Sequence, residues 1–364
     1  MTAAGPAVTP TAGVMPVRAS LLRRLRADYF STPLNALVSL ACLAAIVAIL
    51  VPLLRWAVIN ADFAGTTRAD CTSGGACWVF VKARFGQFMY GFYPPAERWR
   101  VDLAALLMIA TTALSFWPRL PRRALTVPLL WATLLIVAAW LLAGGAGLPR
   151  VETRQWGGLM LTVFLSVYAG ALAVPLGILL ALGRQSELPV IRLVATIFIE
   201  FWRGVPIITV IFLASLLLPL VMPAGWDIDR LIRALVGLAF VIAAYMAEAV
   251  RGGLQAVPKG QWEAASAQGL GYWQTTGLIV LPQALRISMP AMTNEFIALV
   301  KNTSLVSIVS IFDLLGIAQA SLADPAWVGM NMEAYAFAGT VYWLICFGLS
   351  RWSRHLETSR RTTH

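Results

Sequence analysis

The sequence predicts an all-α membrane protein with about eight transmembrane helices. Of the 364 residues, 59% are hydrophobic and only 12% are charged, and the mean hydropathy is +0.75. This composition excludes a chain that is surrounded by water on all sides. Several apolar runs also reach the roughly 20 residues that cross the hydrocarbon core of a bilayer as a helix.

Eight apolar runs follow one another along the chain. The first starts only after residue 34 and has no small-residue cleavage site behind it, so it is interpreted as an anchor and not as a removed signal peptide. The second run is short. The runs cover residues 36–54, 101–117, 125–147, 158–182, 205–222, 232–250, 291–312 and 334–350.

Arginines predict the orientation of these runs, because cations concentrate on the cytoplasmic side of a membrane. They gather before the first run, after the second and after the last, at Arg18, Arg23, Arg24, Arg26, Arg119, Arg122, Arg123, Arg351, Arg354, Arg360 and Arg361. Both termini are therefore predicted to be cytoplasmic. Segment 55–100 must then lie outside despite its own cations, which long translocated loops tolerate. The net charge of +11 is ascribed to topology and to contact with anionic membrane lipid, not to nucleic-acid binding.

The chain divides into two blocks of different content. Residues 1–150 hold three of the runs and the long outer loop, whereas residues 151–364 hold five runs and every motif with chemical content. The connecting segment 144–150 is rich in glycine and ends in Pro149-Arg150, which predicts a short, ordered link on the outer side.

A polar loop at about 252–284 separates the sixth and seventh runs and is predicted to be cytoplasmic. Its helix formers, a glycine and a later Leu-Pro predict two short helices at the membrane surface, joined by a bend. The residues that define the pattern are Glu263, Ala264, Ala265, Gly269, Ile279, Leu281 and Pro282.

This pattern resembles the EAA loop of bacterial ABC importer permeases, which reads Glu-Ala-Ala, three residues, Gly, nine residues, Ile, any residue, Leu-Pro. Two further stretches resemble permeases of the histidine and polar amino-acid uptake family. Arg203-Gly204-Val205-Pro206 is similar to the family's Arg-Gly-Thr-Pro, and Lys301-Asn302-Thr303-Ser304-Leu305 to its Lys-Asp-Thr-Ser-Leu. With its N-terminal block, the chain is most similar to one permease of the bacterial general L-amino-acid transporters.

The resemblance implies a five-helix type I importer permease core preceded by three extra helices. It also implies an inner-membrane subunit of an ATP-driven importer of L-amino acids. The implied partners are a second permease subunit, a cytoplasmic ABC ATPase dimer and a periplasmic amino-acid-binding protein. The chain has no Gly-x-x-x-x-Gly-Lys-Ser/Thr phosphate loop, so the partner would bind ATP, and this chain would be neither an enzyme nor a cofactor carrier.

The stretch from Glu263 to Gly269 is predicted to transmit ATPase closure to the membrane helices as a rigid-body motion. Glu263 near a helix start would be favoured by the helix dipole and would meet a basic group of the partner. The simpler alternative is that Glu263 is only an acid at a helix N-terminus.

Glu200 and Arg203 are candidate substrate contacts. They lie three residues apart and so share one helix face, and Gly204 with Pro206 predicts that the helix is interrupted there. Arg203 offers a bidentate donor for a carboxylate, while Glu200 can accept from an ammonium group. The alternatives are that the two side chains pair with each other and fix helix packing, or that they lie at the membrane interface.

Lys301 and Asn302 are the second pair of candidate contacts, placed by the prediction within the seventh run. A lysine there needs a counter-charge or a wet cavity, and Asn302 stands where relatives often carry Asp. A neutral amide suits neutral and varied amino acids. Plain helix packing is the alternative. Glu248 and Arg251, also three apart, are interpreted as a salt bridge near the headgroups.

Cys71 and Cys77 lie in the outer loop around Gly74-Gly75 and predict either a disulfide or two free thiols. No metal site is predicted, because the only histidines are His355 and His364. No catalytic set is present either. Two other functions stay open at this point: an ion-coupled secondary amino-acid transporter, which also uses charged residues and broken helices near the midplane, and a membrane-embedded enzyme or scaffold.

Overall fold

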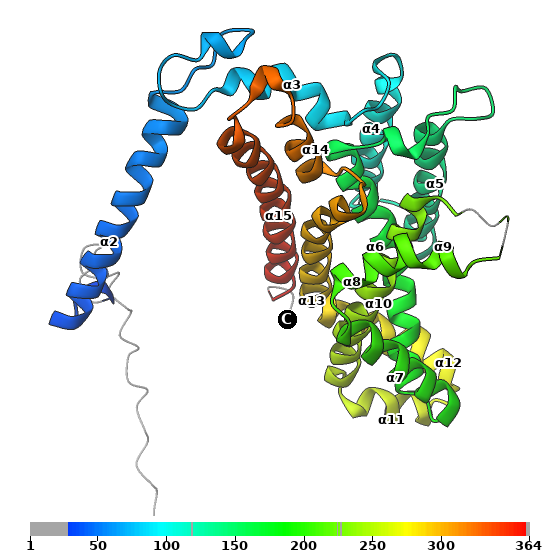
Figure 1. The fold of residues 1–364 in the computed structure, drawn as a ribbon. Coiled ribbons are helices and arrows are strands. Elements are labelled where there is room, and N and C mark those ends of the chain that lie inside the picture. The colour runs from blue at the N-terminus through cyan, green and yellow to red at the C-terminus, as the bar shows by residue number, and fades with distance from the viewer. Residues whose placement is uncertain (1–27, 118, 224, 226–227, 362–364) are drawn as a thin grey trace, which may run out of the picture. The chain divides into compact units, whose positions relative to one another are not determined.

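The computed structural model describes residues 28–117, 119–223, 225 and 228–361, and it builds them almost entirely from helices (Figure 1). The prediction of an all-α membrane protein is confirmed. The helices are α2 (Pro33–Leu54), α3 (Trp78–Tyr90), α4 (Arg98–Ser115), α5 (Arg123–Ala143), α6 (Gly158–Arg184), α7 (Pro189–Gly204), α8 (Ile207–Phe212), α9 (Leu218–Val221), α10 (Arg230–Ala256), α11 (Lys259–Ala267), α12 (Tyr272–Gln274), α13 (Leu281–Asn302), α14 (Leu314–Ser321) and α15 (Asn331–Arg361).

Five helices of the described chain are long and apolar enough to cross a membrane. They cover Pro33–Ile59, Leu125–Ala143, Gly158–Arg184, Arg230–Ala256 and Asn331–His355. A sixth crossing would need α7 together with the segment Ile207–Val221, and these are bent by 101°. The predicted total of eight is therefore not confirmed.

Three of the predicted runs, 101–117, 205–222 and 291–312, are not among these five helices. The run 101–117 forms α4, which begins with two arginines and an aspartate within its first five residues. The run 205–222 forms helix only over Ile207–Val221, because Val205 is extended and Pro206, which has no backbone N–H, starts the new helix. The run 291–312 is helical only to Asn302. It continues as a 3₁₀ helix over Thr303–Val309 and ends at Ser310, whose φ is +58°.

The chain divides into two compact units, of which the first comprises residues 1–62 and 72–76. Its described part is dominated by α2, which starts where Thr32 Oγ1 accepts a hydrogen bond of 3.2 Å from the Asn35 N–H. No residue of α2 is buried. Its apolar surface is thus available to lipid or to another chain.

The second unit comprises residues 63–71 and 77–364 and is centred on α10. Helices α6, α7, α8 and α13 pack around it, and the core includes Leu161, Leu165, Leu238, Ile242 and Met246, all at most 1% exposed. Glycines permit the close approaches, as is usual between membrane helices. Gly177 of α6 faces Met246 and Ala243 of α10, and Gly253 of α10 faces Ala284 of α13.

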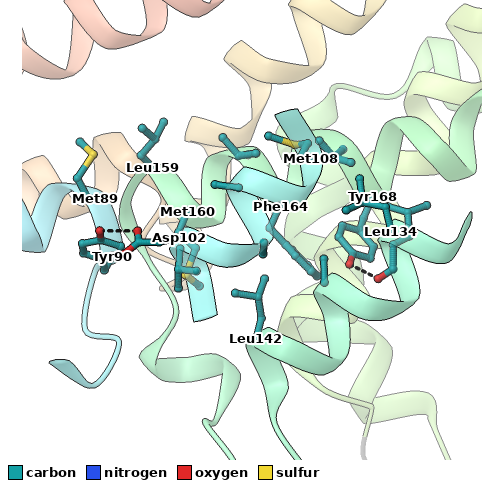
Figure 2. A pocket seen from close by; sticks show the side chains of 17 residues that line it. Met89, Tyr90, Asp102, Met108, Leu134, Leu142, Leu159, Met160, Phe164 and Tyr168 are labelled. Atoms are coloured by element: carbon teal, nitrogen blue, oxygen red, sulfur yellow. Dashed lines mark hydrogen bonds between the residues drawn. The ribbon is translucent and has the colours of Figure 1, made fainter. Parts of the chain in front are cut away.

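Helices α3, α4 and α5 pack within this same unit. Cys77 N–H donates to Glu333 Oε1 at 3.0 Å at the start of α3, and Arg100, fully buried, donates to the Pro149 carbonyl at 2.8 Å. An apolar cavity of about 220 Å³ lies among α3, α4, α5 and α6 (Figure 2). Its polar groups are paired: Tyr90 donates to Asp102 at 2.7 Å. Residues 77–150 therefore share packing with the later helices, and a functional boundary at residue 150 remains a prediction.

We expect Gly253→Val to destabilise the protein strongly. A Cβ at residue 253 would collide with the Ala284 carbonyl oxygen, and overpacking of this kind costs about 1–3 kcal/mol or more. The matched control is Gly252→Val, since Gly252 lies in the same helix and an added Cβ there meets no atom within 4 Å. The thermal unfolding midpoint of the purified protein should fall much further for Gly253→Val. Equal midpoints would contradict the tight α10–α13 contact.

Candidate functional site

The loop that follows α10 has the predicted form of two short helices joined by a bend. Pro258 precedes α11, which ends at Ala267. Gly269 has a φ of +76°, a left-handed conformation that glycine adopts without a steric penalty. The Leu270 N–H donates to the Ala265 carbonyl at 3.1 Å and closes the helix end. The bend is thus encoded locally by Gly269.

The seven pattern residues of this loop divide into buried and exposed sets. Ala265 is 2% exposed and packs inside, while Ile279 and Leu281 are half-buried. The remaining residues are exposed: Glu263, Ala264, Gly269 and Pro282. Gln283 Nε2 donates to Gln261 Oε1 at 3.2 Å and ties the start of α13 to α11. The loop is therefore braced from inside and presents one face outward.

The prediction that Glu263 lies near a helix start is wrong. Pro258 lets α11 begin at Lys259, because proline is well suited to a first helical turn. Glu263 is consequently in the middle of α11, and the helix-dipole explanation for its acid does not apply. Its exposed carboxylate makes no hydrogen bond or ion pair with the residues that the structure describes.

An ionic cluster of five side chains joins α6, α7 and α10. Its members are Arg184 from α6, Glu200 and Arg203 from α7, and Glu248 and Arg251 from α10. Glu248 is the hub: Arg184 Nη1 lies 2.5 Å from Oε1, Arg251 Nη2 lies 2.8 Å from Oε2, and Arg203 Nη1 lies 3.8 Å from Oε1. Arg184 also pairs with Glu200 at 2.8 Å.

This pairing differs from the alternative in which Glu200 and Arg203 bond each other. Although the two share a helix, Glu200 pairs with Arg184, and Arg203 faces Glu248 and the ring of Tyr245, 5.6 Å from its centroid. The expected Glu248–Arg251 salt bridge is present, with Arg251 donating from both Nε and Nη2. The Arg203–Glu248 contact is the longest in the cluster, so Arg203 is the member most easily redirected.

A cavity of about 500 Å³, the Arg203 cavity, adjoins this cluster at the break between α7 and α8. It is lined by Arg203, Gly204, Val205, Pro206, Ile207, Val241, Ile242, Tyr245, Glu295, Ala298 and Asn302. Two of the four predicted substrate residues, Arg203 and Asn302, meet there from α7 and α13. Glu200 and Lys301 do not line it, and both are exposed.

Sequence reasoning missed two contributors to this region. Glu295, half-buried, lines the Arg203 cavity and makes no hydrogen bond or ion pair with any residue in the described ranges. Its signal was present, since an acid inside an apolar run is costly and marks a site. Arg184 had no such signal, because it lies at the end of α6 and gains its role only when α7 and α10 pack against it.

The structure joins Cys71 and Cys77 by a disulfide, with Cα atoms 5.6 Å apart. This is one of the two states that the sequence left open. Cys42 and Cys346 are not bonded. Within the described residues, no group of three or more His, Cys, Asp or Glu side chains is placed to hold a metal ion.

The family and the relatives that this chain resembles are all membrane components of transport systems. Residues 173–362 match the family described as "Binding-protein-dependent transport system inner membrane component". The chain is 51% identical over 345 residues to the inner membrane amino-acid ABC transporter permease protein YhdY of Escherichia coli, covering 93% of this chain and 94% of that protein. It is 35% identical to the glutamate/glutamine/aspartate/asparagine transport system permease protein BztC of Rhodobacter capsulatus, covering 94% of each.

The fold is likewise similar to a solved structure titled "Crystal structure of an amino acid ABC transporter with histidines". The TM-score is 0.50 at 30% sequence identity, and the match covers 56% of this chain and 92% of that one. Since the family match takes in more than half of the chain and the relatives align over nearly all of it, this chain belongs to the family of binding-protein-dependent transport system inner membrane components.

Proposed function

We propose that this chain is the membrane-spanning permease subunit of an ATP-driven importer that takes L-amino acids from a periplasmic binding protein. The observation that carries the proposal is the loop after α10. An exposed short helix with a left-handed glycine at its end follows directly on the most deeply buried candidate span. Relatives named as amino-acid ABC permeases support the same substrate class.

The loop would work as a lever. The carbonyl of Leu254 accepts from Val257 at the end of α10, and α11 starts two residues later, so little chain is free to absorb a displacement. A cytoplasmic ABC ATPase dimer that grips the exposed face of α11 would turn α10 and α13 as a rigid body. ATP is bound by that partner and not by this chain. The transport path would lie between this chain and a second permease subunit, with both termini cytoplasmic.

The Arg203 cavity is the place we propose for substrate during translocation. Arg203 can hold the α-carboxylate with a bidentate pair of hydrogen bonds, and the carboxylate of Glu295 can accept from the ammonium group. Asn302 donates or accepts toward the remaining polar groups. Glu200 would act through Arg184 in the ionic cluster, and Lys301, at the end of α13, would set the potential at the cavity's rim.

Reconstitution separates this function from that of an ion-coupled secondary transporter. We expect uptake by the complete complex to require the ATPase and ATP, and to stop when the ATPase is removed while a proton gradient is kept. An ion-coupled carrier would continue under the second condition. The membership in a family of binding-protein-dependent components already favours the ATP-driven mechanism.

Arg203→Lys should raise the apparent KM for amino-acid uptake by about tenfold, because a lysine ammonium cannot form the bidentate pair with a carboxylate. The matched control is Arg192→Lys, since Arg192 is exposed on the same helix and does not line the cavity. Uptake kinetics in proteoliposomes measure the difference. An unchanged KM for Arg203→Lys would remove Arg203 from the carboxylate role.

Asn302→Asp should shift preference toward basic amino acids. A second carboxylate beside Glu295 would attract a cationic side chain, and we expect the uptake ratio of L-lysine to L-glutamine to rise by about tenfold. Asn294→Asp serves as the control, because Asn294 lies on the same helix but is exposed and does not line the cavity. Identical substrate profiles for the wild type and Asn302→Asp would refute the assignment of Asn302.

A further inference from the structure

A second polar cavity lies at the opposite end of α10 from the loop that contains α11. It has a volume of about 270 Å³ and is lined by Thr153, Arg154, Trp156, Asp229, Arg230, Leu231, Arg233, Ser310, Ile311 and Phe312. We call it the Arg233 cavity. The 27 residues of α10 span about 40 Å, so this cavity is far from α11. If α11 faces the cytoplasm, as proposed above, the Arg233 cavity faces the outside.

Positive charge dominates the lining of the Arg233 cavity. Three arginines contribute to it, and Asp229 is the single acid. Arg154 is largely engaged with Glu152 at 2.5 Å, and Arg230 Nη1 reaches the Val309 carbonyl at 3.3 Å. The side chain of Arg233 makes no hydrogen bond or ion pair with the described residues. Its guanidinium group is therefore the free cation of the site among the side chains that the structure describes.

Two donors at this cavity are buried and unpaired. Trp156 is only 4% exposed, and its Nε1–H has no partner among the described residues. The Nε of Arg233 is buried and unpaired in the same way. A buried donor without a partner is costly, so native proteins rarely leave one unless a ligand or a water molecule completes it. The residues that carry these two donors both line the Arg233 cavity, so an acceptor bound there would complete them once the side chains turn toward it.

Asp229 contributes the negative charge of the Arg233 cavity. Its carboxylate accepts from Thr153 Oγ1 at 2.5 Å and from the Leu231 N–H at 2.8 Å. These bonds fix the carboxylate and leave lone pairs free, because an ionised carboxylate accepts about four hydrogen bonds. Asp229 makes the cavity less favourable for phosphate or another simple anion than the arginines alone would make it. A molecule with both a carboxylate and an ammonium group would be matched at both ends.

We propose that the Arg233 cavity is a second amino-acid site, on the outer side, in which Arg233 and Trp156 hold the carboxylate and Asp229 holds the ammonium group. The cavity is slightly smaller than the roughly 300–1,000 Å³ typical of sites for drug-sized ligands, which suits one free amino acid. The site would receive cargo before it reaches the Arg203 cavity. Its placement outside rests on the proposed function, but its ligand chemistry does not.

The test is protection of a thiol inside the cavity. Ser310 lines the cavity and is exposed, so Ser310→Cys in a Cys42→Ala, Cys346→Ala background supplies the only added reactive thiol. The complete complex in nanodiscs, without the binding protein, is labelled with N-ethylmaleimide in the presence of each of nineteen L-amino acids; L-cysteine is left out because its thiol consumes the reagent. At about ten times its Kd an amino acid leaves roughly one site in eleven free, so labelling should slow about tenfold.

Modified amino acids and variants of the protein test which groups of the ligand and of the cavity are needed for binding. Protection should be lost with amino-acid amides, which lack the carboxylate, and with N-acetyl amino acids, which lack the ammonium group. Arg233→Gln should abolish protection, measured as the ratio of each variant's labelling rates with and without the amino acid. Gln155→Cys is the control, since Gln155 is adjacent in sequence but does not line the cavity, and no amino acid should slow its labelling.

Three results would overturn the proposal: labelling unaffected by all nineteen amino acids, protection that survives Arg233→Gln, or protection that appears only when the binding protein is added. The last result would assign the carboxylate to an acidic side chain of a protein partner. ATP-dependent uptake by the same preparation reports separately on the proposed function. If the preparation takes up amino acids but the thiol is not protected, the second site is refuted and the importer function is not. If the thiol is protected but no uptake occurs, the importer function is refuted and the second site is not.

Discussion

Replacing Glu248 by glutamine is expected to destabilise this protein by about 2–4 kcal/mol, because it leaves three guanidinium groups around a neutral amide. Breaking a buried ion pair by removing one partner costs about 3–5 kcal/mol. The Glu248 side chain is 19% exposed and those of its arginine partners 26–36%, so partial screening lowers the expected figure. The measurement is the thermal unfolding midpoint of the purified complex.

The matched control for Glu248→Gln is Glu187→Gln. Glu187 is exposed in the α6–α7 connection, and it makes no hydrogen bond or ion pair with the described part of the chain, so its removal should change stability by less than about 0.5 kcal/mol. The double variant Arg184→Gln, Glu248→Gln should be less destabilised than the sum of the two single variants, since the residues are in direct contact. Full additivity, or equal midpoints for Glu248→Gln and Glu187→Gln, would show that Glu248 is not the hub of the cluster.

Gly269→Val is expected to reduce ATP-driven uptake by tenfold or more while leaving insertion into the membrane intact. A left-handed residue other than glycine costs about 1–2 kcal/mol, and β-branched side chains are the worst tolerated there. An added Cβ at Gly269 meets no atom within 4 Å, so the effect would come from the backbone and not from a clash. The strained bend would tilt α11 away from the ATPase.

Two variants isolate the backbone conformation at Gly269. Gly269→Asn should retain most of the uptake, because asparagine adopts left-handed angles several times more readily than other residues. Gly260→Val makes the same substitution inside α11, where an added Cβ again meets nothing within 4 Å and where φ is not positive. Uptake and co-purification of the ATPase should follow the order wild type, Gly269→Asn, Gly260→Val, Gly269→Val. Normal co-purification with Gly269→Val would count against docking through this loop.

Features of this protein that depend on neighbouring residues follow from its sequence. The membrane class and the bend at Gly269 were predicted correctly. The first depends on whether the side chains prefer lipid or water, and the second on the backbone preference of a few adjacent residues. The break at Gly204-Val205-Pro206 was also predicted, because proline removes a donor wherever it stands. The total of eight crossings was not confirmed. The run 101–117 forms α4, which begins with charged residues, the run 205–222 forms helix only over Ile207–Val221, and the run 291–312 continues in 3₁₀ form after Asn302.

By itself, the sequence determined that this protein is a helical membrane protein with a bend at Gly269, because those properties follow from hydropathy and local backbone preference. The permease function was predicted by the resemblance of the loop motif to a known family. Only the tertiary structure decided how the charges pair. Glu248 gathers three arginines, Arg203 meets Glu295 and Asn302 at one cavity, and Arg233 joins Trp156 and Asp229 at another. The physical reason is that a charge interacts with whatever lies within a few ångströms, and which helices come that close is set by the packing of α6, α7, α10 and α13 and not by their spacing along the chain.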